Sequence, residues 1–149
     1  MSKETPTTIR ESSGAPAFEE IEHTADWALR IYGSNLEELL RHAAQGMNSL
    51  MATDFSPPSR LKKKSVVLDA PDVESLLVDW LSELAYWAET EMLVFQRFDF
   101  HKVSPTHVTA TVYGGRAPQL EKHIKAVTYH NLKIVQTAGG LSATVVFDV

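Results

Sequence analysis

The chain has 149 residues, of which 44% are hydrophobic and 22% charged, values that are ordinary for one soluble globular domain. It contains no cysteine, which excludes thiolate zinc sites, iron–sulfur clusters, cysteine nucleophiles and a disulfide-stapled scaffold, and favours a reducing compartment. The net charge is −5 and the one short basic run, Lys62–Lys64, is best explained as a solvated strand edge, so no sequence-specific nucleic-acid binding is expected. No apolar stretch reaches the length of a membrane helix and no signal peptide is apparent, so we expect a cytoplasmic protein that does not engage a membrane.

The beginning of the chain differs in composition from the rest. Residues 1–17 are rich in Ser, Thr, Pro, Gly and charge, so they cannot repay the entropy of ordering and are predicted to form a flexible tail. A single domain is expected over residues 18–149. Within it, Trp27–Tyr32 alternates in the period of a half-buried strand, which Gly33 ends.

A helix is predicted directly after this strand. The segment Ser34-Asn35-Leu36-Glu37 has the pattern of a capping box that begins at Ser34. Apolar residues then recur at three- and four-residue spacing as far as about Met51, which predicts an amphipathic helix. The following segment, Thr53–Ser59, contains two prolines and is predicted to be a loop.

The second half of the chain predicts one more helix and a run of antiparallel strands. A short apolar strand over Ser65–Ala70 precedes a helix that begins at Pro71-Asp72 and carries one apolar stripe as far as Ala88. Strand-like segments separated by turn residues follow at Leu93–Lys102, His107–Tyr113, about Lys122–Val127, Leu132–Thr137 and Leu141–Asp148. These elements predict an α+β fold in which two main helices pack on one face of a mixed, mostly antiparallel sheet.

Polar residues interrupt the apolar pattern at three places. The first is the segment Glu22–Asp26, for which a turn with locally satisfied backbone groups is the simpler explanation. The second is an otherwise apolar stretch that is most simply a buried strand with satisfied polar groups. Its polar members are Lys125, Thr128, Tyr129 and His130. The third is Asp148, which alternation places on the opposite face from Phe147 and which can simply be solvated.

Asp26 and Asp148 nonetheless share a chemistry, because both offer carboxylate oxygens, and the terminal carboxylate of Val149 adds a third donor if the natural chain ends there. Oxygen ligands suit Ca²⁺, Mg²⁺ or Mn²⁺ better than zinc. The two Asp residues are 122 positions apart, so they form a site only if the fold brings the chain ends together. A competing zinc site would use three histidines that lack the close spacing of such ligands, namely His23, His123 and His130.

Four segments of the chain, in this order and spacing, resemble the archease family: FEEIEHTADWALRIYGSNLEELLRHAA, DVESLLVDWLSELAYWAE, KAVTYHNLKI and FDV. The resemblance covers nearly all of residues 18–149. The combination of H-T-A-D with a much later K-A-V-T-Y-H is specific. It implies a fold of strand-helix-strand-strand modules that form one mixed sheet with helices packed on it.

The resemblance also implies a function. Archeases are small acidic accessory proteins of the GTP-dependent RNA ligase that joins cyclic-phosphate and 5′-hydroxyl ends in tRNA splicing and RNA repair. They promote guanylylation of the ligase and its multiple turnover without being enzymes themselves. By position, Asp26, Asp148 and Val149 match the family's metal site, usually described as a calcium site. The other residues that match family motifs are His23, Thr24, Lys125, Thr128, Tyr129 and His130.

The chain departs from the family pattern at three places. The segment Gly114–His123 looks shorter than usual, and Gly115 stands where the family often has an acidic residue. Both differences weaken the case for a ligand or contact from that segment. The bulky Trp27 follows Asp26, which matches the family's metal site, and is expected to affect packing beside that site.

Two other classes of function fit the residues. A metal-dependent hydrolase or phosphotransferase would use Asp26 and Asp148 as ligands and His23 or His130 as acid and base. It requires a concave pocket that unites an open metal position with a histidine. A general protein chaperone or adaptor would instead require a large exposed apolar patch.

Overall fold

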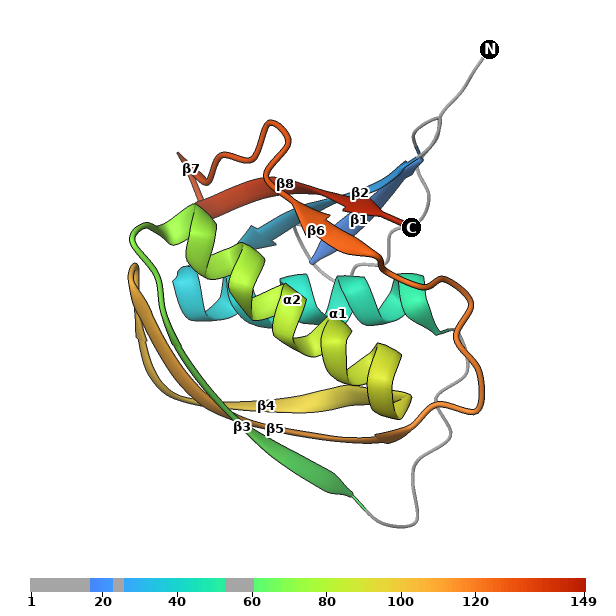
Figure 1. Cartoon of the computed structure of the whole chain (residues 1–149). Helices are drawn as coiled ribbons and strands as arrows, with labels where there is room; N and C mark the ends of the chain where they lie inside the picture. Colours follow the sequence, from blue (N-terminus) through green and yellow to red (C-terminus); the bar gives the residue numbers. More distant parts are fainter. Residues whose placement is uncertain (1–16, 23–25, 53–60) are drawn as a thin grey trace.

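The computed structural model of the chain describes residues 17–22, 26–52 and 61–149. In these residues two antiparallel sheets enclose a layer of two helices (Figure 1). The α+β class and the antiparallel strands predicted from the sequence are confirmed. The arrangement is corrected in one respect, because the strands form two separate sheets, each packed on the helices through one face, rather than one mixed sheet. Most of the predicted tail and all of the predicted loop at 53–59 lie outside the described residues.

The larger sheet has two central strands and three short or peripheral ones. Its members are β1 (Phe18–Glu22), β2 (Asp26–Gly33), β8 (Gly140–Asp148), β6 (Ala126–Thr128) and β7 (Val135–Thr137). β2 and β8 pair with each other in the centre, β1 pairs with the other side of β2, and β6 and β7 pair with different parts of β8. The central strands match the prediction, whereas β6 and β7 begin later than the expected Lys122 and Leu132.

The smaller sheet has the strand order β3-β5-β4, with bounds Lys62–Asp69, His107–Arg116 and Leu93–Ser104. The three lysines that were expected to precede β3 are its first residues, because they pair in register with β5. β4 shifts register between Phe95 and Arg97 and again between Phe100 and Lys102. The side-chain amide of buried Asn48 donates a hydrogen bond to the Phe95 carbonyl beside the first shift.

Helices α1 (Leu36–Met51) and α2 (Val73–Glu91) form the middle layer and bury their apolar stripes toward both sheets. α2 begins as predicted, since Asp72 is its N-cap and accepts a hydrogen bond from the Ser75 N–H at 2.8 Å. Trp80 of α2 is fully buried and its Nε1–H donates to the Leu40 carbonyl of α1 at 2.9 Å. No helix among the described residues is both long and apolar enough to cross a membrane.

The start of α1 is displaced by one residue from the predicted capping box. Its N-cap is Asn35, whose side-chain oxygen accepts the Glu38 N–H at 2.9 Å. The Glu38 carboxylate accepts the Ser34 N–H at 2.6 Å and so satisfies a second backbone donor. Glu37, the expected partner in the box, instead pairs with Arg41 at 3.6 Å.

Candidate functional site

Asp26 and Asp148 are direct cross-strand partners in the β2–β8 pair, although they are far apart in sequence. Asp26 is the first residue of β2 and Asp148 the last residue of β8. Direct partners in an antiparallel pair project to the same side of the sheet. The buried residues Leu29 and Val145, also partners, face the helices, so both aspartates lie on the outer face, at the end of the sheet. The fold therefore brings together the two aspartates that the sequence singled out.

The backbone around Asp148 is held from both sides. β2 flanks it on one side, and on the other side Ala126 of β6 is its partner. The Lys125 N–H donates a hydrogen bond to the Asp148 carbonyl at 2.7 Å. The side chain of Asp148 is exposed, and Val149, partly exposed, follows it. Lys125 thus belongs to the surroundings of the aspartate pair through its backbone.

The facing aspartates are an electrostatically unfavourable pair. Like charges placed directly opposite one another on a sheet are destabilising. Neither carboxylate forms an ion pair with another described residue. Oxygen donors of this kind suit a hard divalent cation, which would neutralise the repulsion. The chemistry of the two carboxylates is therefore of the kind that such an ion prefers.

Few acidic or imidazole side chains lie at the Asp26–Asp148 pair. Within residues 17–22, 26–52 and 61–149, no group of three or more His, Cys, Asp or Glu side chains could hold a metal ion. The described residues of the predicted ligand set are Asp26, Asp148 and Val149. His23 and Thr24 lie outside the described residues, between β1 and β2, and remain predictions.

The second family motif lies at the surface, so the predicted buried strand is wrong. β6 ends at Thr128, whose Oγ1–H donates to the Val146 carbonyl at 3.0 Å. Tyr129 and His130 are exposed, because the chain leaves the sheet after Thr128 and turns at Asn131, which has a φ of 52°. The His130 N–H donates to Thr128 Oγ1 at 3.2 Å.

The motif runs along β8 away from the aspartate pair. Ala126 is opposite Asp148, whereas Thr128 is opposite Val146, so each further residue increases the separation. His130, which bonds its neighbour Asn131, is not brought to the aspartates. The ring Nδ1 of His123 lies 2.9 Å from the Glu89 carboxylate of α2, within hydrogen-bonding distance. The described histidines therefore do not assemble the zinc site considered from the sequence.

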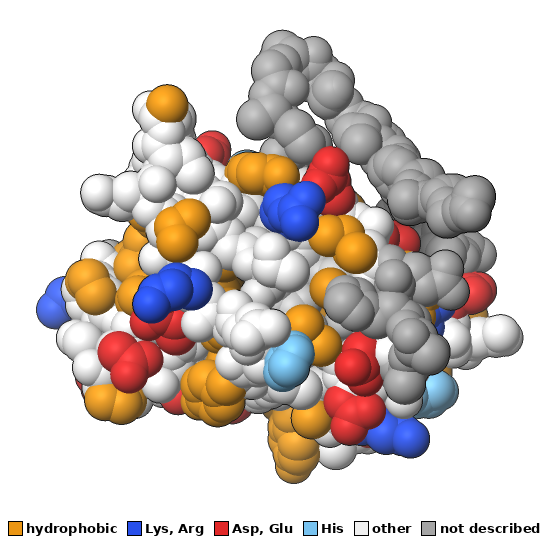
Figure 2. All heavy atoms as spheres, turned by 90° about the horizontal axis from the view of Figure 1, so that it is seen from above, with side chains coloured by type: hydrophobic (Ala, Val, Ile, Leu, Met, Phe, Trp, Pro, Cys, Tyr) orange, Lys and Arg blue, Asp and Glu red, His pale blue; other side chains and the backbone are white. Residues whose placement is uncertain are grey.

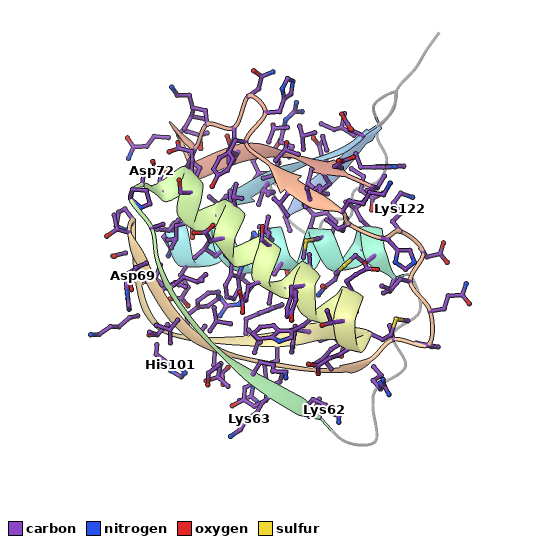
Figure 3. All side chains as sticks on the ribbon, in the orientation of Figure 1. Lys62, Lys63, Asp69, Asp72, His101 and Lys122 are labelled. Atoms are coloured by element: carbon purple, nitrogen blue, oxygen red, sulfur yellow. The ribbon has the colours of Figure 1, made fainter. Side chains whose placement is uncertain are left out.

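Sequence reasoning missed two contacts near these motifs. The Lys122 ammonium lies 4.3 Å from the centre of the Trp27 ring, and Figure 3 places Lys122 near the end of the molecule where β6 and β8 meet. The Glu74 carboxylate, in the first turn of α2, accepts the Ile134 N–H at 3.0 Å and so ties the segment after the second motif to the helix. No spacing rule indicates the first contact, and an acidic residue in a first helical turn is ordinarily explained by the helix dipole.

Seen from above the larger sheet, acidic, basic and apolar side chains are interspersed (Figure 2). The strands of this sheet carry five acidic residues and one basic residue, a net charge of −4. The acidic residues are Glu19, Glu20, Glu22, Asp26 and Asp148, and the basic one is Arg30. The sheet that holds the aspartate pair is therefore markedly acidic.

The sequence model of a family described as "Archease protein family (MTH1598/TM1083)" matches residues 18–149. This chain belongs to the archease family. The "Protein archease" of Methanosarcina mazei is 37% identical to it over 140 residues, which are 89% of this chain and 95% of that protein. The "Protein archease" of Methanothermobacter thermautotrophicus is 33% identical over 138 residues, covering 89% of this chain and 98% of the relative.

Two solved structures support the archease fold. The solution structure of Methanobacterium thermoautotrophicum protein 1598 matches with a TM-score of 0.70 and 31% identity, over 89% of this chain and 99% of that one. The crystal structure of an archease from Thermotoga maritima, described as a possible chaperone, matches with a TM-score of 0.58 and 25% identity. It covers 94% of this chain and 100% of that one. The resemblance drawn from the sequence motifs is confirmed.

Proposed function

We propose that this archease is a non-catalytic activator of the GTP-dependent RNA ligase of tRNA splicing and RNA repair, and that it promotes ligase guanylylation and multiple turnover. It binds a divalent cation, calcium by family expectation, through Asp26, Asp148 and Val149. The observation that carries the metal site is the cross-strand aspartate pair, which has no cationic partner among the described residues. Family membership supports the ligase as partner.

The residues around Asp26 and Asp148 explain how the surface that contacts the ligase is ordered before binding. β2 and β8 hold the two aspartates at facing positions, and the Lys125 N–H fixes the Asp148 backbone. A bound divalent cation would be held by Asp26 of β2 and Asp148 of β8, and it would supply positive charge that offsets the two carboxylates. A surface that is already ordered loses less entropy on binding. The acidic sheet suits a ligase cleft that must attract phosphate and is therefore positively charged.

Two observations favour this proposal over the alternatives. A hydrolase that used His130 as acid or base would need that ring beside the metal, but His130 follows β6 in the direction away from Asp148. A general chaperone would need a large apolar patch. The large apolar side chains that are exposed in the described residues come from four separate segments, and they are Leu61, Val67, Tyr86, Tyr129 and Val135.

The test is RNA joining by the cognate ligase at substoichiometric ligase concentration, with calcium present. Wild-type protein is compared with D26N, D148N and E19Q. Each substitution removes one negative charge, and Glu19 lies on the same sheet without facing the aspartate pair. We expect several products per ligase with the wild type and E19Q, and about one with D26N or D148N.

Two results would contradict the proposal. Stimulation that survives in the double variant D26A/D148A, together with unchanged calcium binding measured by titration calorimetry, would remove the aspartates from the function. Failure of the wild-type chain to raise ligase turnover at all would remove the ligase as its partner.

A further inference from the structure

Strand β3 forms one edge of the smaller sheet, and no described strand pairs with its outer side. Its eight residues keep one register against β5 throughout. The other described edges are less suited to accept a further strand. β4 shifts register twice, β1 has five residues of which three are glutamates, and β6 and β7 have three residues each. β3 therefore presents the longest regular row of unpaired backbone groups at an edge of the described sheets.

The side chains of β3 alternate between the helix layer and the outer face of the sheet. Val66 is buried against the helices, whereas Val67 is 65% exposed on the outer face. Alternation places Lys63 and Asp69 on the same face as Val67. Lys63 forms no ion pair with another described residue. One oxygen of Asp69 lies 2.7 Å from His107 Nδ1, but the Asp69 side chain is 79% exposed, so its carboxylate can accept a second partner.

A second copy of β3 fits this edge in an antiparallel register centred on Val66. Lys63 and Asp69 lie near opposite ends of the strand (Figure 3), so in this register each Lys63 lies directly opposite the Asp69 of the other copy. Ser65 lies opposite Val67, and the two exposed Val67 side chains become diagonal neighbours. A shift by two residues in either direction keeps the faces matched but loses both Lys63–Asp69 pairs.

The lysines at the start of β3 do not face one another in this register. Lys62 lies opposite Ala70, and Lys64 lies opposite Leu68. Lys64 already has a partner within its own chain, because its ammonium lies 3.3 Å from the Glu91 carboxylate. Lysines on an edge strand ordinarily discourage pairing with other strands. Here they discourage strands that lack a matching carboxylate, whereas a second copy supplies one.

We propose that two copies of this chain pair through β3 in this register and form a symmetric dimer. The two three-stranded sheets then become one continuous sheet, and the two Lys63–Asp69 pairs determine both the partner and the register. Residues 63–69 of each copy make a contact about 23 Å long at the usual strand rise, and so narrow a contact belongs among the weak interfaces. The larger sheet lies on the other side of the helix layer (Figure 1), so the aspartate pair takes no part in this contact.

The experiment measures the mass of the purified full chain by sedimentation equilibrium from about 1 µM to about 1 mM, the range in which a weak dimer forms. No ligase and no calcium are present, so the outcome is independent of the proposed function. K63E places two carboxylates opposite each other at both ends of the contact, and D69K places two ammonium groups there. We expect a concentration-dependent dimer for the wild type and a dissociation constant at least about tenfold higher for each single variant.

The double variant K63E/D69K exchanges the two charges and should restore the dissociation constant to within about threefold of the wild-type value. K102E is the control, because it makes the same charge change as K63E on the other edge strand of the sheet, and it should dimerise like the wild type. Circular dichroism checks that every variant is folded.

Three outcomes would overturn the inference. A wild-type chain that stays a monomer up to about 1 mM would exclude a second copy as the occupant of this edge and leave it to a strand of another protein. K63E makes the chain more acidic and D69K makes it less so, and opposite effects of the two on dimerisation would show that net charge determines association. Weakening by both single variants without recovery in K63E/D69K would exclude the register centred on Val66.

Discussion

At the scale of single residues, the facing aspartates have opposite effects in the absence and presence of a cation. Asp26 and Asp148 repel each other across the β2–β8 pair, so the metal-free protein tolerates an unfavourable interaction. A ligand that binds only the folded state stabilises it in proportion to the logarithm of its concentration above its dissociation constant. Removal of one aspartate should therefore change the free energy of unfolding in opposite directions without and with the cation. The sign of that change separates a structural role from a ligand role.

We predict that D26N or D148N raises the free energy of unfolding of the metal-free protein by about 0.2 to 1 kcal/mol, because each removes the like-charge repulsion. The same variants should lose the increase in melting temperature that calcium gives the wild type. Thermal unfolding with chelator and with calcium measures both effects. E19Q serves as control, because its partner is Arg30 and it should keep the calcium response. Destabilisation of the chelated variants would show that the pair is not repulsive.

At the scale of elements, the first turn of α1 depends on residues that differ from those expected. Asn35 caps the helix through the Glu38 N–H, and the Ser34 side chain takes no part in that bond. We predict that N35A lowers the free energy of unfolding by about 1 kcal/mol, whereas S34A has a much smaller effect. Urea denaturation of both variants measures the difference. A larger cost for S34A would restore the capping box predicted from the sequence.

The first turn of α1 also predicts that the stability of the protein depends on pH. The Ser34 N–H holds the pKa of Glu38 below its ordinary value of 4.5. A carboxyl group with a lowered folded-state pKa adds stability that is present above the unfolded value and is lost as pH falls through the folded value. We predict that E38Q is less stable than the wild type by about 0.3 to 1 kcal/mol at pH 7, and that the difference disappears as pH falls below 4.5. A difference that stays constant to pH 3 would contradict this.

The elements that sequence predicted well are those whose signals are local. Gly33 and Asp72 mark where β2 ends and α2 begins, and both positions agree with the structure. The predicted N-cap of α1 is one residue too early, because Ser34 and Asn35 are both good caps and each has a glutamate three residues later. Exposure of Tyr129 was missed because the chain leaves the sheet directly after Thr128, and the composition of the stretch does not show this.

Local sequence signals do not show which strands pair with one another across long stretches of the chain. Alternation identifies the buried face of a strand but not its neighbours, so the division of the strands into two sheets was not predictable. The facing of Asp26 and Asp148 depends on the register of β2 against β8, across nearly the whole chain. That pairing was anticipated from the family motifs rather than from the residues alone.

At the scale of the whole molecule, the two sheets are joined through one helix layer. Trp80 lies at its centre and contacts the smaller sheet, with ring centroids 6.0 Å from Phe98 and 5.2 Å from Phe100. Trp27 belongs to β2 of the larger sheet. Trp87 packs against Phe95 of the smaller sheet at 5.6 Å. Trp80 and Trp87 both belong to α2 and contact the smaller sheet, whereas Trp27 belongs to the larger sheet, so the tryptophans report on both sheets.

We predict that W80F lowers the free energy of unfolding by about 2 to 4 kcal/mol, because it leaves a cavity and removes the hydrogen bond to the Leu40 carbonyl. In the W80F background, removal of Trp27 or of Trp87 leaves a single fluorescent reporter for each sheet. Because both sheets bury their inner faces on the same helices, the two reporters should follow one urea transition, and circular dichroism should coincide with them. The melting curves of the two reporters would separate if the sheets were independent units, and the core of residues 18–149 would then be two domains rather than one.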